Sequence, residues 1–232
     1  MLSTATIFDM LLCYITDRHA FPGDENQQRR ALLERVAEAA RAGLDYIQLR
    51  EKDLTTRELE SLAKDVVGVV RSSSQATRIL INERTDVALA CGADGVHLPG
   101  KSLPASEVRS VWMRSAGRAP AIGVSAHSVD EIRYAEAQGA DFALLAPIFE
   151  KPNTELRGLG LDLLSIACHG VPVAANTEAA PRSSFPVLAL GGVNLSNAAA
   201  CIRAGASGLA AIRLFQEGEL VETVHTLRRI AS

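Results

Sequence analysis

The chain has 232 residues, of which 47 % are hydrophobic and 22 % charged, and its formal net charge is −3. So small an acidic charge gives no electrostatic support for binding nucleic acid or an anionic membrane surface. No apolar run reaches the ~18 residues of a transmembrane helix, and the first residues lack the pattern of a signal peptide. The four cysteines form no CxxC pair, so we expect buried thiols in a cytoplasmic protein.

Short apolar runs rich in β-branched residues alternate with longer amphipathic stretches along the chain. The residue ranges of the eight runs are 11–17, 46–51, 78–82, 95–99, 121–127, 142–149, 186–192 and 208–215. Between them, ranges such as 29–43 and 55–70 repeat apolar residues every three or four positions, which indicates helices. Nearly continuous apolar strands separated by helices predict a parallel sheet that is covered by the helices.

Four glycine-containing triplets each end a predicted helix just before a strand. They begin at Gly43, Gly92, Gly139 and Gly205, at intervals of 49, 47 and 66 residues. A glycine there is typical of a helix C-cap, because positive φ costs it little. The first two intervals each fit two strand–helix units, and the third is about 18 residues longer.

An inserted loop explains the longer interval. The segment at about 170–185 is rich in Ala, Ser and Pro without a clear period, and it precedes the seventh strand. With residues 1–10 as an N-terminal extension, we interpret residues 1–232 as one α/β domain, a TIM (β/α)₈ barrel. A doubly wound open sheet is the alternative architecture.

In such a barrel, chemistry occurs where strands end and the following loops begin. The predicted strand ends are Asp17, Arg50, Asn82, Pro99, His127, Phe149, Gly192 and Phe215. Because alternate residues of a strand share a face, Gln48, Arg50 and Lys52 point the same way, as do Ser125 and His127. The polar residues after the second strand could also be a solvated charge run, and His127 a structural histidine.

A phosphate site is predicted after the last two strands. Gly191 and Gly192 are followed by a helix start with Asn194 or Ser196 as its N-cap, and Arg213 lies on the eighth strand. Glycines let a phosphate approach the backbone, and free N–H groups at a helix start bind anions. These loops are also the usual phosphate site of the fold.

Several segments in the same order resemble the thiamine phosphate synthase/TenI family over nearly the whole chain. They are YITD, IQLREKD, ILINERTDVALACGADGVHLPG, GVSAHSVDEI, GADFALLAPIF and LALGGV. The resemblance implies a TIM barrel that binds a thiazole phosphate carboxylate. The family's synthases join a pyrimidine diphosphate to this thiazole and release diphosphate with Mg²⁺, whereas the TenI branch moves a proton on the thiazole.

The resemblance also implies residue roles. Pyrimidine or diphosphate binding is implied for Gln48, Arg50, Lys52, Asn82 and Ser125.

For the thiazole half of the reaction, Gly191 and Gly192 match the thiazole-phosphate loop. His127 matches a histidine of both branches, which resembles an acid/base in TenI. Lys151 follows the sixth strand, where the synthases hold their substrates, and is included as a substrate-binding candidate.

Three departures from the synthase pattern affect the diphosphate and metal half of the site. Glu83 stands where synthases have Asp, and Lys101-Ser102 stands where they have an acidic Mg²⁺ ligand. The synthase run after the sixth strand is replaced by residues 150–154. Mg²⁺ can be bound by one carboxylate together with substrate phosphates, so Glu83 alone could serve a synthase.

The departures favour a metal-independent thiazole tautomerase that uses His127 as its acid/base and needs no cofactor. A Mg²⁺-dependent thiamine phosphate synthase is the alternative, and a catalytically degenerate binding or regulatory barrel is the third hypothesis. The expected partner is a small phosphorylated thiazole. We expect no binding to nucleic acid or to a membrane, and the sequence is compatible with a homo-oligomer.

Overall fold

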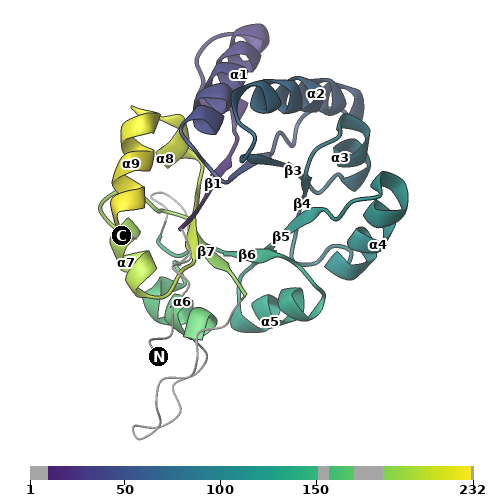
Figure 1. The fold of residues 1–232 in the computed structure, drawn as a ribbon. Coiled ribbons are helices and arrows are strands. Elements are labelled where there is room, and N and C mark those ends of the chain that lie inside the picture. Colours follow the sequence, from purple (N-terminus) through teal and green to yellow (C-terminus); the bar gives the residue numbers. More distant parts are fainter. Residues whose placement is uncertain (1–9, 151–156, 170–184, 231–232) are drawn as a thin grey trace, which may run out of the picture.

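A computed structural model describes residues 10–150, 157–169 and 185–230, and in them eight parallel strands close into a barrel in chain order (Figure 1). The strands are β1 (Leu11–Ile15), β2 (Tyr46–Leu49), β3 (Arg78–Asn82), β4 (Gly95–Leu98), β5 (Ala121–Ala126), β6 (Phe142–Leu145), β7 (Val187–Leu190) and β8 (Gly208–Ala211). The predicted TIM barrel is therefore confirmed, and the open sheet is excluded because β1 pairs with β8.

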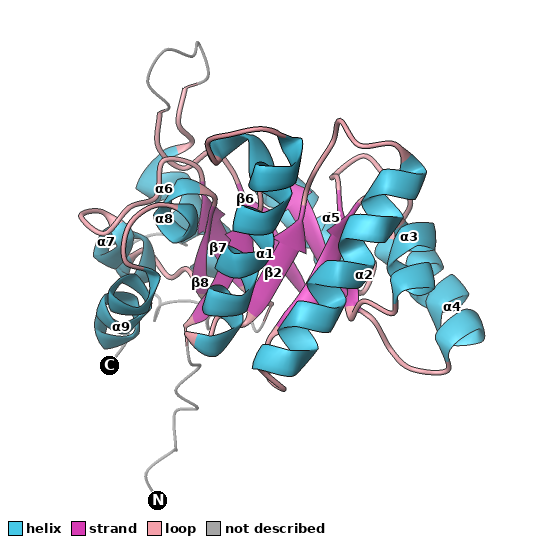
Figure 2. Ribbon diagram, turned by 90° about the horizontal axis from the view of Figure 1, so that it is seen from above, coloured by secondary structure: helices cyan, strands magenta, loops and turns pink. Residues whose placement is uncertain are grey.

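Helices surround the strands on the outside of the barrel (Figure 2). They are η1 (Arg18–Ala20), α1 (Glu25–Arg41), α2 (Thr56–Ser73), α3 (Thr85–Cys91), α4 (Ala105–Ala116), α5 (Val129–Ala137), α6 (Gly160–His169), α7 (Ala198–Arg203), α8 (Arg213–Gln216) and α9 (Leu220–Ile230). Among the described helices, none has the length and apolar character needed to cross a membrane.

The two longest helices begin with complete capping boxes. In α1 the Asp24 side chain accepts from the Gln27 N–H, and the Gln27 side chain accepts from the Asp24 N–H. Thr55 and Glu58 make the same exchange in α2. These bonds satisfy N–H groups that have no partner within the helix, and so fix where each helix starts.

Two apolar clusters lie on opposite sides of the strands. The larger one fills the space between strands and helices. The interior cluster fills the barrel and consists of Cys13, Ile15, Leu80, Ala121, Phe142, Leu144, Leu188 and Ala210. By strand alternation, Gln48, Asn82, His97 and Ser125 continue the inward-facing series toward the C-terminal end, which we call the mouth. The filled interior thus closes the barrel below the mouth.

The N-terminal end of the barrel repeats one hydrogen bond in three consecutive strand pairs. An aspartate just before the second strand accepts from an N–H of the first: Leu12 to Asp45 (2.7 Å), Ile79 to Asp94 (2.9 Å) and Ile122 to Asp141 (2.7 Å). These aspartates also pair with Arg228, Arg118 and Arg109, respectively. The glycines of all four triplets have positive φ, as predicted for helix ends. The triplets therefore close the barrel at the end opposite the mouth.

Seven of the eight strands end earlier than predicted, by one residue at β2, β4 and β5 and by two at β1, whose last residue is Ile15. β6 ends at Leu145 instead of Phe149, and β7 ends at Leu190 instead of Gly192. The prediction for the eighth strand was wrong for Arg213. This residue begins the one-turn helix α8 and does not lie on β8. The chain leaves the extended conformation at Ile212 (φ −93°, ψ −77°) and buries Phe215 among the outer apolar residues. Apolar character continued past the strand because the next element is buried too.

The four cysteines are buried, as expected. The proposed inserted loop falls almost entirely on residues 170–184, and the N-terminal extension on residues 1–9. Both lie outside the described residues.

Candidate active site

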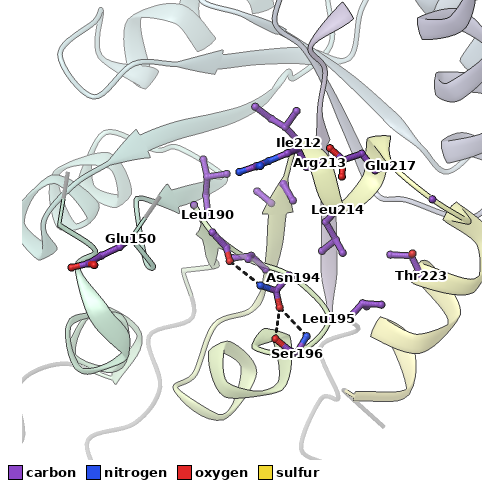
Figure 3. Close-up of a pocket in the computed structure, with 16 residues that line it drawn as sticks. Glu150, Leu190, Asn194, Leu195, Ser196, Ile212, Arg213, Leu214, Glu217 and Thr223 are labelled. Carbon is purple, nitrogen blue, oxygen red and sulfur yellow. Dashed lines mark hydrogen bonds between the residues drawn. The ribbon is translucent and has the colours of Figure 1, made fainter. Parts of the chain in front are cut away.

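A pocket of about 830 Å³ lies at the mouth after β7 and β8 (Figure 3). Its lining includes Gly191, Gly192, Asn194 and Arg213. The Arg213 side chain is exposed and points toward Leu190. The structure thus brings together the residues predicted to bind phosphate, although Arg213 reaches the pocket from α8.

Both glycines of this pocket are required by the backbone. Gly191 and Gly192 have φ of 94° and 68°, a region that side chains disfavour. A Cβ on Gly191 would lie 2.7 Å from the Pro147 Cα, and one on Gly192 would lie 2.7 Å from the Phe149 Cβ. The glycine pair therefore packs against the segment after β6, which is a reason for glycine independent of any ligand.

Two asparagines hold the loop in place: Asn194, which was predicted as a candidate N-cap, and Asn197, which the sequence analysis did not name. Asn194 Oδ1 accepts from the Ser196 N–H (2.9 Å) and hydroxyl (2.6 Å), and Asn197 Nδ2 donates to the Gly192 carbonyl (2.9 Å). The predicted N-cap was wrong, because α7 starts at Ala198 with Asn197 as the capping residue. Asn194 closes a turn instead, as asparagine often does.

Backbone donors remain available in this loop. In the described part of the chain, the N–H groups of Gly192, Val193 and Leu195 donate to no acceptor. Arg213 forms no ion pair with a described carboxylate, and Glu150 on the other side of the pocket points away from it (Figure 3). Free N–H groups beside a cation suit a phosphate.

The other half of the mouth carries the polar residues after β2 and β3. Gln48 is buried and its Nε2 has no partner among the described residues. Arg50 is half-buried and Lys52 is exposed, with the Lys52 Nζ 4.0 Å from a Glu83 carboxylate oxygen. Asn82 ends β3 in register with His97 of β4. A buried amide donor and two cations thus lie at the end of β2, beside the end of β3.

His97 contacts this half of the site, although the sequence analysis assigned it no role. Its Nε2 is 2.8 Å from the Ser125 hydroxyl, and its Nδ1 has no partner among the described residues. Burial, with a smaller contribution from the positive charge of Arg50, lowers the pKa of His97 to about 3. His97 is therefore neutral at physiological pH. Its inward-facing place on β4 was the signal that could have identified it.

His127 follows β5 and is exposed, so it is not a buried structural histidine. Its Nδ1 is 2.7 Å from the Ala146 carbonyl oxygen, and its backbone N–H donates to Glu131 (2.7 Å). Because a carbonyl can only accept, Nδ1 carries the proton in the neutral ring. Nε2 is then left as an acceptor, which is the form that a general base requires.

Candidate metal ligands are few in the described part of the chain. Among the described residues, no group of three or more His, Cys, Asp or Glu side chains could hold a metal ion. Glu83 has φ 62°, unusual for a residue other than glycine, and is paired with Lys52. Ser102 donates to the Leu103 carbonyl (3.3 Å). These residues fit Mg²⁺ only if substrate oxygens complete its shell, with Glu83 as the carboxylate. Lys151 lies outside the described residues.

Fold and mouth together define the class of protein: a TIM barrel whose polar residues gather at the C-terminal ends of the strands, where barrel enzymes carry out their chemistry. The family follows from comparison with known sequences. Residues 12–215 match the family model described as thiamine monophosphate synthase, and the chain belongs to this family.

Relatives of similar length support the assignment. A putative thiamine-phosphate synthase 2 of Aquifex aeolicus is 39 % identical, covering 88 % of this chain and 96 % of the relative. A thiamine-phosphate synthase of Roseiflexus sp. is 36 % identical, covering 85 % and 75 %. The solved thiamine phosphate pyrophosphorylase from Pyrococcus furiosus has a TM-score of 0.74 at 29 % identity, covering 97 % and 96 %. These names favour the synthase alternative over the tautomerase expected from the sequence.

Proposed function

We propose that the chain is a thiamine-phosphate synthase that joins a pyrimidine diphosphate to a thiazole phosphate carboxylate and releases diphosphate and carbon dioxide in the cytoplasm. The observation that carries this proposal is that two separate regions of one mouth present cationic side chains, and we assign both regions to anion binding. Arg50 and Lys52 follow β2, whereas Gly192 and Arg213 follow β7 and β8. A reaction between two phosphorylated substrates needs both regions, and an isomerisation needs one.

Each of the two regions binds a different substrate. The loop of Gly191 and Gly192, with Arg213, holds the thiazole phosphate through N–H groups and a guanidinium. Arg50 and Lys52 bind the diphosphate and stabilise the negative charge that grows on it as its bond to the pyrimidine carbon breaks.

The polar residues deeper in the mouth complete the diphosphate half. Asn82 and Ser125 contribute further polar contacts. The Gln48 Nε2, which has no partner among the described residues, suits the pyrimidine ring. Mg²⁺, bound by Glu83 and the diphosphate, would add positive charge at the leaving group.

A thiazole tautomerase is the second candidate, and the geometry of His127 favours it. The Ala146 carbonyl orients the ring and leaves Nε2 free to accept a proton from a bound substrate and return it. This reaction uses the phosphate pocket and no metal.

One assay separates the candidates. The purified protein is incubated with both substrates, with and without Mg²⁺, and both thiamine phosphate and the thiazole tautomer are quantified. Mg²⁺-dependent formation of thiamine phosphate supports the synthase. Conversion of the tautomer without condensation would replace it by the second candidate, and neither product would indicate a binding barrel.

A further inference from the structure

A buried group of charges lies beside the mouth, between the loops after β1 and β2. The Arg18 and Glu51 side chains are 5 % and 1 % exposed, and Arg18 Nη1 donates to a Glu51 carboxylate oxygen (3.2 Å). The Arg18 backbone N–H also donates to Glu51 (3.1 Å), and its guanidinium donates to both oxygens of Asp53. The hydrogen bonds from Arg18 hold the pKa of the Asp53 carboxyl well below its usual range.

Thr16 joins the same group to the backbone of β2. Its hydroxyl donates to Glu51 (2.6 Å) and accepts from the Arg50 N–H (3.0 Å). Thr16 is fully buried at the end of β1. One hydroxyl therefore fixes both the backbone of Arg50 and the side chain of the residue that follows it.

These contacts fix the segment that carries the two cationic residues of the diphosphate region. They do so through the acidic residues that alternate with the two cations. Arg50 and Lys52 alternate with Glu51 and Asp53, and only the acidic residues are tied to Arg18. The side chain of Arg50 makes no bond to the group, and Lys52 lies between two anchored residues. The anchors constrain the segment without using the two cations, although Lys52 pairs with the exposed Glu83 (4.0 Å).

Stability alone is a weak reason for such a pair. Removing two charges from water costs several kcal/mol per ion, and the attraction in the pair often does no more than offset this cost. An apolar pair of similar volume would stabilise the loops at least as well, but it would not fix direction. A hydrogen-bonded pair specifies one geometry.

We propose that Glu51 is a positioning residue, which through its buried pair with Arg18 holds Arg50 and Lys52 in the direction that binds the diphosphate of the substrate. This inference rests on the proposed function, because it assigns the diphosphate to that region. Glu51 does not touch the ligand in this account. Its effect is confined to one of the two anion-binding regions.

The test compares two ligands on the variant Glu51→Gln, which keeps the shape of the side chain and removes its charge. Calorimetry measures binding of inorganic diphosphate with Mg²⁺, and of thiazole phosphate carboxylate alone. We expect diphosphate affinity to fall about tenfold or more, because small misplacements of binding groups are costly. Thiazole phosphate affinity is expected to stay within about twofold, since its region lies after β7 and β8.

A matched control removes an equivalent charge at the other end of the barrel. Asp45→Asn weakens the pair with Arg228 and is expected to change neither affinity. If Glu51→Gln does not fold, Thr16→Val, which removes the shared hydroxyl at nearly constant volume, is measured instead. Unchanged diphosphate affinity, or equal loss of both ligands, would overturn the positioning role. Wild-type protein that binds diphosphate but forms no thiamine phosphate would contradict the proposed function alone.

Discussion

At the scale of single residues, His127 has one ring nitrogen bonded to the Ala146 carbonyl and the other without a protein partner in the described part of the chain. If the ring transfers the proton of a tautomerase, His127→Asn should lower turnover by about 10²–10⁴-fold. The affinity for thiazole phosphate should change little, because Gly192 and Arg213 hold the phosphate. Steady-state kinetics and calorimetry measure the two effects. Near-normal turnover would show that His127 is not the acid/base.

Gly192 makes a second prediction at this scale. An alanine would have to adopt φ near 68° and place its Cβ 2.7 Å from that of Phe149. Left-handed backbone costs an alanine about 1–2 kcal/mol, so Gly192→Ala should lower the free energy of unfolding by at least that amount. It should also weaken phosphate binding by displacing the loop. Urea unfolding and phosphate titration test both effects, and Gly139→Ala is the control: it has a similar φ of 77° but lies away from the mouth, with no atom near its added Cβ.

The residues of the site were predictable where they lie on a strand. Gln48, Asn82 and Ser125 lie on strands close to their C-terminal ends, so the strand pattern placed them where chemistry was expected. Arg213 was misplaced because an apolar run continued from β8 into α8. Asn197 was missed because its role depends on the folded turn that brings its amide to the Gly192 carbonyl. Contacts between loops depend on tertiary structure, which no periodicity encodes.

At the scale of elements, the aspartates before β2, β4 and β6 each form a hydrogen bond to the preceding strand and so connect two consecutive strands. Asp141→Ala should cost about 1–3 kcal/mol, because the Ile122 N–H loses its side-chain acceptor. Asp141→Asn keeps an acceptor and weakens only the exposed pair with Arg109, so it should cost less than about 1 kcal/mol. Urea unfolding gives both values. A loss of substrate affinity in either variant would contradict the assignment of this end to stability.

The order and number of the strands were predictable for a related reason. Each strand is a short apolar run between helices with clear periods, and the repeated triplets mark every second unit. The ends of β6 and β7 were not predictable, because Pro147 and Gly191 belong to loops that pack against each other. Burial continues across the end of the strand while the hydrogen-bonded ladder stops.

At the scale of the whole molecule, the buried His97 links folding to pH. Its pKa is about 3 in the folded protein and ~6.5 in the unfolded chain, so the unfolded chain binds the extra proton between these values. The contribution of His97 to stability is therefore complete above pH 6.5 and is lost as pH falls toward 3. Between pH 7 and 5, wild type should lose up to about 2 kcal/mol more than His97→Gln. Unfolding curves at both pH values measure this difference, and equal losses would show that His97 is protonated when folded.

The aspartate hydrogen bonds also indicate where the chain could be cut to make a circular permutant. Each aspartate bond joins two strands that are consecutive in sequence, so no such bond crosses the exposed turn at Gln75 and Ala76. Arg228 of the last helix donates to the Met10 carbonyl, which brings the two ends of the described chain together. A circular permutant that joins residue 230 to residue 10 by a short linker and opens at Gln75 should therefore fold and melt cooperatively, as circular dichroism would record. If the permutant folds, the aspartate bonds stabilise strand pairs without fixing which strand comes first in the chain.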